Sequence, residues 1–405
     1  MKPHPSPEQN PPHSAAELPS PPSPVGLTPE GALPAPEPVP DARLPLVQAW
    51  LAQLPEPRGL QLASLRAASS DASFRRYFRI DGAADSAGNA ASPRASYIVM
   101  DAPPDKEDCG PFVQVAQLLA DQGVSTPRIL AQDLGQGLLL LTDFGNTTYS
   151  DALAHEGVDI HGLYSDALDT LVRIQRAPTR DLPAYDSARL LAEMHLFTDW
   201  YVPRHLGLTL EPADRAILDE SFALLAQAAQ AQGQVVVHRD YHCRNLMVLD
   251  RASAPSADPV PATAPGCTPR LHNPGVIDFQ DACVGPVAYD LVSLLRDAYV
   301  EWPEALQIDW AARYWEQARA AGLPVPTQFD VFWRDMEWIG LQRALKVLGI
   351  FARLCYRDGK ARYLADLPLV LRHTQTVVER YDRFHRLARL LDRLHQRTST
   401  TGFSF

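Results

Sequence analysis

Residues 235–248 of the chain are VVVHRDYHCRNLMV. An apolar run leads into His238, Arg239 and Asp240, and Asn245 follows Asp240 after five positions. A buried strand that ends in a polar loop places acid and amide side chains at a defined point of the fold. The spacing between the acid and the amide therefore suggests a site rather than a simple turn.

The pattern H-R-D-x-x-x-x-N is typical of the catalytic loop of enzymes that transfer phosphoryl groups. In such a loop the acid, here Asp240, accepts the proton of the attacking hydroxyl, and the amide, here Asn245, holds a metal ion that bridges the phosphates of ATP. Residues 275–281, GVIDFQD, repeat the order of strand and acid. Asp278 is thus predicted to be the second Mg²⁺ ligand. A strand followed by a polar turn could produce either block by chance, but the ordered pair favours catalysis.

Asp143-Phe144-Gly145 also spells a magnesium motif of kinases, yet it precedes residue 240 by about a hundred positions, whereas in kinases this motif follows the catalytic loop. Because it follows an apolar run, we predict that it belongs to a hinge strand that lines the adenine site. Leu141, Thr142 and Phe144 are the predicted nucleotide-binding residues there.

Composition sets the broad class of protein. The chain has 405 residues, 46% of them hydrophobic, and a formal net charge of −11, which does not suit a nucleic-acid surface. Its five cysteines have no C-x-x-C spacing, so neither a zinc site nor a disulfide framework is suggested, and a reducing cytoplasm is expected. No apolar run is long enough to cross a membrane. We expect no obligate protein partner.

The first forty residues hold 14 of the 37 prolines, so residues 1–42 are predicted to be a disordered tail rather than a signal peptide. Residues 43–141 are predicted to form a small nucleotide-binding lobe with the order β, β, α, β, β, and residues 142–405 a larger catalytic and substrate lobe. A Pro/Ala-rich insertion is predicted at 250–273. Apolar periodicity predicts helices in the larger lobe at 164–176, 190–201, 213–232, 289–299, 310–321, 329–356 and 368–396.

The acceptor is expected to be a small molecule. Asp290 follows Asp278 by only twelve residues and no A-P-E sequence comes after, which leaves no room for the activation loop of a protein kinase. Asp290 is predicted to cap backbone amides or to brace the catalytic loop, and His238 to be a buried structural residue, since Asp240 already supplies the base.

HRDYHCRN and VIDFQDACVGPVAYDLVSLLRD resemble the aminoglycoside phosphotransferase and choline kinase superfamily over about residues 45–390. The resemblance implies an α+β, two-lobed protein-kinase-like fold with a small antiparallel β lobe. SDASFRRYFR, MDAPPDKEDC, LLLTDFG, EMHLFTDWY and LQRALKVLGIFARLCYRDGKARYL are similar to bacterial kinases that phosphorylate the anomeric C1 hydroxyl of N-acetylmuramate and N-acetylglucosamine during peptidoglycan recycling. That similarity implies the same substrates, ATP and Mg²⁺.

The chain departs from the kinase pattern at the phosphates. Met100 stands where kinases carry a lysine, its helix partner Glu is replaced by Gln114, and residues 69–73 contain no glycine. Ser73, Arg75 and Arg76 are the predicted replacements, because arginine grips phosphate oxygens with a planar fork. The alternative for both arginines is a solvated strand end.

Predicted substrate residues lie on two helices. Glu193, Phe197 and Trp200 are spaced to share one helix face, where they could offer a hydroxyl acceptor and apolar platforms, although both aromatic residues could equally be core. Arg343 and Lys346 could meet the lactyl carboxylate of N-acetylmuramate, or form a solvated basic face. Two other functions stay open: a kinase for another small alcohol such as an aminoglycoside, and a nucleotide-binding pseudokinase.

Overall fold

The computed structural model describes residues 43–54, 59–70, 74–82, 95–249 and 272–396. The predicted tail 1–42, Ser73 and residues 250–271 of the predicted insertion lie outside the described residues. Contacts divide the chain into Met1–Leu46 and Val47–Phe405. The first unit is described only at the start of helix α1 (Leu44–Gln53), and the second holds every other element below.

A five-stranded antiparallel sheet with the order β1-β2-β3-β5-β4 forms the first part of the larger unit. The structure contains one strand more than the predicted β, β, α, β, β, because Arg66–Ser70 pairs with the next strand although it is too polar to stand out in the sequence. The strands are β1 (Arg66–Ser70), β2 (Arg76–Asp81), β3 (Ser96–Asp101), β4 (Ile129–Asp133) and β5 (Leu138–Thr142).

The leucine run Leu138–Leu141 is buried on both faces of this sheet, because successive side chains of a strand point to opposite sides. Leu138 and Leu140 join a small core with the Val47, Trp50 and Leu51 side chains of α1. Leu139 and Leu141 instead join the main core. An unbroken apolar run therefore marks a strand that is covered on both sides.

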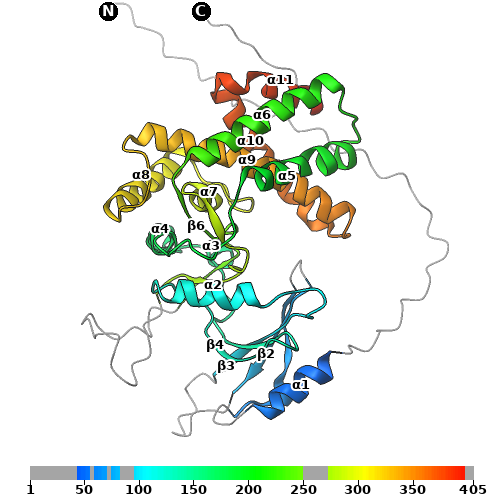
Figure 1. Cartoon of the computed structure of the whole chain (residues 1–405), viewed down its shortest axis with the longest axis vertical. Coiled ribbons are helices and arrows are strands. Elements are labelled where there is room, and N and C mark those ends of the chain that lie inside the picture. The colour runs from blue at the N-terminus through cyan, green and yellow to red at the C-terminus, as the bar shows by residue number, and fades with distance from the viewer. Residues whose placement is uncertain (1–42, 55–58, 71–73, 83–94, 250–271, 397–405) are drawn as a thin grey trace, which may run out of the picture. The chain divides into compact units, whose positions relative to one another are not determined.

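Helix α2 (Gly110–Ala120) lies along the sheet in Figure 1 and buries its apolar side chains in the main core, together with Met100 of β3. The Phe112 ring of α2 is 4.8 Å from the ring of Phe279, the residue after Asp278. The sheet, α2 and the predicted metal loop thus share one core.

Helices dominate the remainder, and Figure 1 shows α5, α6, α9 and α10 gathered together. The 28-residue helix at 329–356 was predicted with its observed bounds. The helix predicted at 190–201 is an α-helix that continues as a π-helix, η2. The helix predicted at 368–396 is broken at Tyr381. The helices are α3 (Tyr149–Leu153), α4 (Ile160–Gln175), α5 (Ser187–Leu196), η2 (Phe197–His205), α6 (Pro212–Ala231), α7 (Tyr289–Leu295), α8 (Glu304–Ala320), α9 (Phe329–Tyr356), α10 (Leu367–Arg380) and α11 (His385–Leu394). Short 3-10 turns lie at Leu62–Ser64, Ala361–Asp366 and Asp382–Phe384.

Helix α9 approaches the end of α5 closely at Gly349. A Cβ atom added there would lie 2.3 Å from the backbone carbon of Leu196 and 2.6 Å from its oxygen. The absence of a side chain at Gly349 is therefore what lets the two helices meet.

Two short ladders bring the two sequence blocks together. Strand β7 (Leu246–Met247) pairs with β8 (Gly275–Val276), and the Ile277 amide donates to the Asn245 carbonyl at 3.1 Å. Strand β6 (Gln234–Val237) pairs with β9 (Cys283–Pro286). The antiparallel pairings place residue 245 beside residue 278 although 33 positions separate them.

Leu249 and Asn273, which lie on either side of residues 250–271, are in contact, because the Leu249 amide donates to Asn273 Oδ1 at 3.0 Å. The Asn273 amide nitrogen is in turn fixed by the Tyr149 hydroxyl and by Asp166, each at 2.9 Å. The chain thus leaves the catalytic blocks and returns to them at one point.

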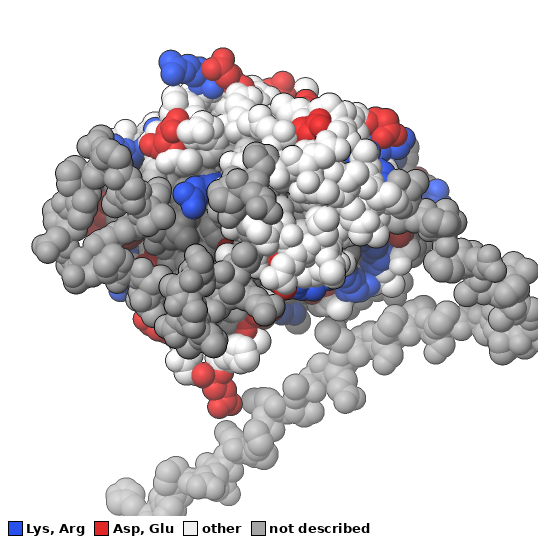
Figure 2. Space-filling model, turned by 90° about the horizontal axis from the view of Figure 1, so that it is seen from below, with Lys and Arg blue, Asp and Glu red and all other residues white. Residues whose placement is uncertain are grey.

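Charged side chains of both signs are interspersed on the face shown in Figure 2. A search of the helices in the described ranges found none with the length and apolar character needed to span a bilayer. The described part is a small antiparallel sheet followed by a helix-rich remainder, as the predicted fold class requires.

Candidate functional site

Asp240, Asn245 and Asp278 lie together. The Asn245 side-chain nitrogen donates to the Asp240 carbonyl at 3.0 Å and to Asp278 Oδ2 at 3.2 Å. The other Asp278 oxygen accepts from Gln280 Nε2 at 2.9 Å. One amide therefore fixes the acid of each block relative to the other, which is the arrangement that the two sequence motifs predict.

The oxygen donors of Asn245 and Asp278 fit a magnesium ion. Mg²⁺ prefers oxygen ligands and is usually held by one or two carboxylates, with phosphates and water completing its shell. The described residues contain no group of three or more His, Cys, Asp or Glu side chains that could hold a metal by themselves. A cation here would thus depend on the phosphates of a bound nucleotide.

His238 is buried under the catalytic loop and bonded on both ring nitrogens. Nε2 donates to the Ile277 carbonyl at 3.1 Å, and Nδ1 accepts from the Asp240 amide at 3.3 Å. Burial lowers the pKa of His238 to about 4, so the ring is neutral near pH 7. These bonds suit the predicted bracing role.

Two buried carboxylates hold the catalytic loop from behind. Asp290 accepts from the amides of His238 at 2.6 Å and Arg239 at 3.0 Å, so of the two predicted roles it braces the loop. Asp297 accepts from the Cys243 amide at 2.9 Å. Sequence reasoning missed Asp297, which lies just beyond the end of α7 and whose contact with Cys243 spans 54 positions of the chain, so no local signal marks it.

Asp240 itself is partly open, with 40% of its side chain exposed. Its partial burial would raise its pKa, but the charges of Lys346 and Arg343 outweigh this and hold the pKa of Asp240 well below its usual range. The nearest Arg343 nitrogen is 3.8 Å from Asp240 Oδ1. The carboxylate is therefore ionised and can accept a hydrogen bond from a hydroxyl.

Arg343 and Lys346 are buried, with 8% and 5% of their side chains exposed, so the alternative of a solvated basic face is wrong. Arg343 donates to the Arg239 carbonyl at 2.9 Å, and Lys346 Nζ lies 3.0 Å from Glu193 Oε2. Glu193 also accepts from Arg239 at 2.5 Å. These side chains reach the catalytic loop from α5 and α9.

Phe197 and Trp200 lie on the π-helix η2, beyond the end of the helix that carries Glu193. Phe197 is fully buried and stacks on Tyr201 at 5.1 Å between ring centroids, while Trp200 is half-buried against the main core. The residues from Phe197 onwards form a π-helix, which changes the angular spacing on which the prediction rested. This packing favours the core interpretation for Phe197.

Arg75 and Arg76 point to different faces of the small sheet. Arg76 bonds to the fully buried Asp101 and stacks over Phe78 at 5.4 Å, on the face that packs against α1. Tyr77 pairs with Met100 on the opposite face, which belongs to the main core. The register therefore separates Arg76 from the side of the sheet that carries α2.

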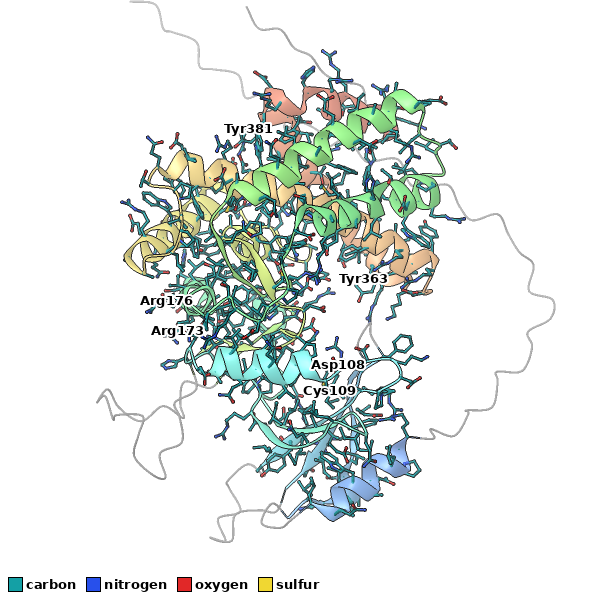
Figure 3. The ribbon with its side chains drawn as sticks, in the orientation of Figure 1. Asp108, Cys109, Arg173, Arg176, Tyr363 and Tyr381 are labelled. Atoms are coloured by element: carbon teal, nitrogen blue, oxygen red, sulfur yellow. The ribbon has the colours of Figure 1, made fainter. Side chains whose placement is uncertain are left out.

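Arg75 lies near the start of α2, where Figure 3 labels Asp108 and Cys109. Its Nε is 3.7 Å from Glu107 Oε2, and the other oxygen of Glu107 accepts from the Phe74 amide at 3.2 Å. Glu107 is a second residue that the sequence did not single out. It joins the end of the β1–β2 loop to the segment before α2.

The hinge residues are partly engaged with the sheet. Thr142 donates its amide to the Arg128 carbonyl at 3.0 Å, which leaves no free amide there for a base. Leu141 is buried, and Phe144 packs on Gly275, where an added Cβ would lie 2.6 Å from the Phe144 ring. Asp143 binds Arg79 and the Ser96 hydroxyl, so it is tied to the sheet and is not beside Asn245.

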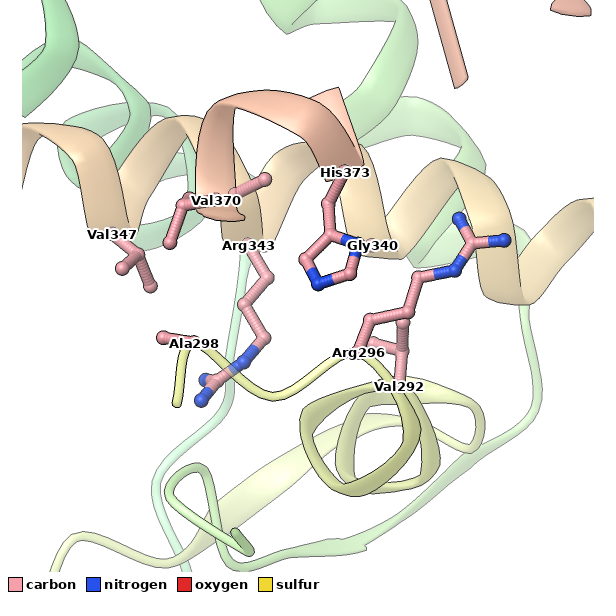
Figure 4. Close-up of a pocket in the computed structure, with 9 residues that line it drawn as sticks. Val292, Arg296, Ala298, Gly340, Arg343, Val347, Val370 and His373 are labelled. Atoms are coloured by element: carbon pink, nitrogen blue, oxygen red, sulfur yellow. The ribbon is translucent and has the colours of Figure 1, made fainter. Parts of the chain in front are cut away.

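A cavity lies between α7, α9 and α10 (Figure 4), and the aliphatic part of Arg343 forms one wall of it. The His373 ring points into it. The side chains that line it are Val292, Arg296, Ala298, Gly340, Arg343, Ala344, Val347, Val370 and His373.

Comparisons with known proteins agree with this geometry. The model of the phosphotransferase enzyme family (APH) matches residues 64–254 and 270–328. Proteins named N-acetylmuramate/N-acetylglucosamine kinase from Pseudomonas putida and Pseudomonas aeruginosa are 46% and 47% identical, over 82% of this chain and 88% and 89% of their own length. A solved choline/ethanolamine kinase family protein from Mesorhizobium loti has a TM-score of 0.52 at 13% identity, covering 86% of this chain and 98% of its own.

The match to the family model includes both sequence blocks, and the solved relative shares the protein-kinase-like fold. Asp240, Asn245 and Asp278 lie within the matched residues, where Asn245 contacts the other two. On these grounds the chain belongs to the phosphotransferase enzyme family, and it is a small-molecule kinase.

Proposed function

We propose that the chain transfers the γ-phosphoryl group of ATP to the anomeric C1 hydroxyl of N-acetylmuramate and of N-acetylglucosamine, in the recycling of cell-wall sugars. The observation that carries this proposal is the contact of the Asn245 side chain with the Asp240 backbone carbonyl and the Asp278 carboxylate, in a chain 46% identical to a kinase named for these two sugars. The sugar follows from the relatives' names, and the reaction from the site.

Asp240 orients the sugar hydroxyl and accepts its proton. Its depressed pKa makes it a weak base, which suits a loose transition state in which the proton leaves late. Asn245 and Asp278 would hold Mg²⁺, which neutralises charge on the phosphates when bound. Asp290 and Asp297 keep the loop in place through its backbone amides.

For the nucleotide, we propose that Leu141 and Phe144 line the adenine site and that Arg75, not Arg76, reaches the phosphates. Arg76 is occupied by Asp101 on the other face of the sheet. Arg75 is held by Glu107. This arginine, paired with a carboxylate, takes the place of the lysine that kinases carry at the position of Met100. The role that remains for Thr142 is to line the adenine site.

Positive charge near Asp240 favours an anionic acceptor over a polycationic aminoglycoside. Arg239, Arg343 and Lys346 lie beside Asp240 and Glu193, and Asp281 is a further acid near Arg239. Arg343, next to Asp240, is the basic residue that would attract the lactyl carboxylate of N-acetylmuramate. Trp200, half-buried, could offer its exposed edge to the sugar.

Phosphorus NMR tests the reaction. Purified protein with ATP, Mg²⁺ and each sugar should give a new phosphomonoester signal, and a proton–phosphorus correlation should connect it to the anomeric proton. Asp240→Asn should lower turnover at least about 100-fold, because the proton acceptor is lost. Asp309→Asn, on an exposed ion pair of α8, is the matched control and should behave as wild type. Product at another hydroxyl, or only from an aminoglycoside, would refute the proposal.

A further inference from the structure

Arg239, directly before Asp240, has a left-handed backbone with φ of +80°. This conformation costs a residue that carries a side chain about 1–2 kcal/mol. Such residues persist only where the surrounding structure holds them, and they often occur at functional sites.

The backbone of Arg239 is held at both ends of the residue. Its amide donates to Asp290 Oδ1 of α7 at 3.0 Å, and its carbonyl accepts from Arg343 Nη1 of α9 at 2.9 Å. The carbonyl belongs to the peptide group that joins Arg239 to Asp240. The contact with α9 therefore fixes the plane of that peptide group and, with it, the direction in which the Asp240 side chain leaves the backbone.

The side chain of Arg239 adds a third anchor. Nη2 donates to Glu193 Oε1 of α5 at 2.5 Å, and the guanidinium lies 5.6 Å from the ring centroid of Tyr185. Nη1 lies 3.6 Å from Asp281. Only 11% of the Arg239 side chain is exposed.

Both carboxylate oxygens of Glu193 are in use. Oε1 binds Arg239, while Oε2 binds Lys346 Nζ at 3.0 Å and accepts from the Tyr185 hydroxyl. Lys346 is further fixed by the Tyr289 hydroxyl at 3.1 Å. Both oxygens of Glu193 thus already accept from buried groups of this chain, which favours a role in holding the catalytic loop over the expected role as a hydroxyl acceptor.

We propose that Glu193 and Arg239 form a positioning pair that ties the catalytic loop to α5 and holds the left-handed peptide from which Asp240 extends. Glycine takes this backbone conformation without strain. The chain instead carries arginine and retains the strain, which is explained if the side chain tethers the loop. The pair acts on the reaction through Asp240, and the inference uses the proposed sugar phosphorylation only as its readout.

Three variants separate the backbone from the tether. Arg239→Gly removes the tether and relieves the strain, Arg239→Ala removes the tether only, and Glu193→Gln removes the charge that binds Arg239. Both Arg239 variants should lose kcat about 10- to 100-fold, since a small misplacement of a reacting group has effects of this size. KM for sugar and for ATP should change less than about threefold, because ground-state binding is kept.

The double variant Glu193→Gln with Arg239→Gly should be no slower than the slower single variant, because both changes remove one shared contact. Arg239→Gly should also unfold at a higher temperature than Arg239→Ala, since only the glycine relieves the backbone. Arg313→Ala, which breaks the exposed ion pair with Asp309 on α8, is the control, and its loss should leave kcat unchanged.

Wild-type kcat in folded Arg239→Gly would overturn the inference, as would a double variant whose losses multiply. A raised sugar KM at unchanged kcat in Glu193→Gln would make Glu193 a substrate ligand instead. If Glu193→Gln fails to fold, Arg239→Gly decides, because it leaves Glu193 paired with Lys346. If the wild-type chain phosphorylates none of the sugars, the proposed function fails. The ratios of variant kcat to wild-type kcat are then measured for the hydrolysis of ATP without acceptor.

Discussion

At the scale of the residue, the catalytic blocks share an unusual backbone. Arg239, which directly precedes Asp240, has a φ of +80°, and Asp278 has a φ of +64°. Aspartate tolerates this region better than most residues, because its short side chain can bond locally, and Asp278 does so with Gln280. Both acids are thus aimed by backbone geometry that a sequence motif encodes only indirectly.

His238 makes the stability of the catalytic loop depend on pH. Its pKa is about 4 in the folded chain and about 6.5 when unfolded, so the unfolded chain binds a proton first as the pH falls. The stabilisation is fully present above pH 6.5 and is lost as the pH falls towards 4, by up to about 3 kcal/mol. Burial raises the pKa of Asp290 to about 7, so the contribution of Asp290 to stability is lost as the pH rises, not as it falls.

A His238→Gln variant isolates this effect. The difference in free energy of unfolding between wild type and the variant should shrink between pH 6.5 and pH 4, because glutamine cannot titrate and Asp290 contributes to both proteins. Urea unfolding at pH 7.5, 5.5 and 4.5 provides the measurement. A difference that stays constant over this range would show that folding does not shift the pKa of His238.

The residues at this scale were predictable to different degrees. The proximity of Asp240, Asn245 and Asp278 could be predicted from the two motifs, whereas their catalytic and metal-binding roles stay predictions. Glu107 and Asp297 could not be predicted, because their roles depend on which backbone amides lie opposite them, and those contacts cross 33 and 54 positions of the chain.

At the scale of the element, helix α9 carries much of the site. It was predicted with its observed bounds, because 28 residues of sustained apolar periodicity leave little doubt about a helix. The burial of Arg343 and Lys346 was not predicted, since basic residues are rarely buried unless paired and their partners lie on α5, α7 and the catalytic loop.

The close contact of α9 with α5 gives a test of this arrangement. Gly349→Ala places a methyl group 2.3 Å from backbone atoms of Leu196, so the helices must separate. We expect a loss of at least about 1–3 kcal/mol in the free energy of unfolding, the usual cost of overpacking. Gly135→Ala, whose nearest contact would be an ordinary 3.4 Å, is the control. Equal stability of both variants, measured by urea unfolding, would contradict the close approach.

At the scale of the whole molecule, one core connects the sheet to the predicted metal loop through Phe112 and Phe279. Buried ion pairs also join distant helices, as where Glu337 of α9 binds Arg296, Arg380 and the Tyr381 hydroxyl, a residue labelled in Figure 3. The two-lobed fold class could be predicted from the order of elements, but such long-range pairs could not, because nothing local in the sequence marks them. The lobe boundary at residue 141 stays a prediction.

Nucleotide binding should stabilise the chain as a whole. ATP with Mg²⁺ at about 100 times its dissociation constant adds about 2.7 kcal/mol and should raise the midpoint of thermal unfolding by several degrees. Asp278→Asn should lose most of this shift with Mg²⁺, while the apo midpoint stays close to that of wild type. An unchanged shift in the variant would remove Asp278 from the metal site, and differential scanning fluorimetry distinguishes the outcomes.

The hydrogen bond between Leu249 and Asn273 has a practical consequence. Leu249, four residues after Asn245, and Asn273, five residues before Asp278, are therefore neighbours in space. A fluorescent protein whose own ends lie close together could be spliced between them without pulling the ladder apart. Because both splice points lie so near the metal ligands, such a fusion would convert nucleotide occupancy into an optical signal and make the kinase a biosensor.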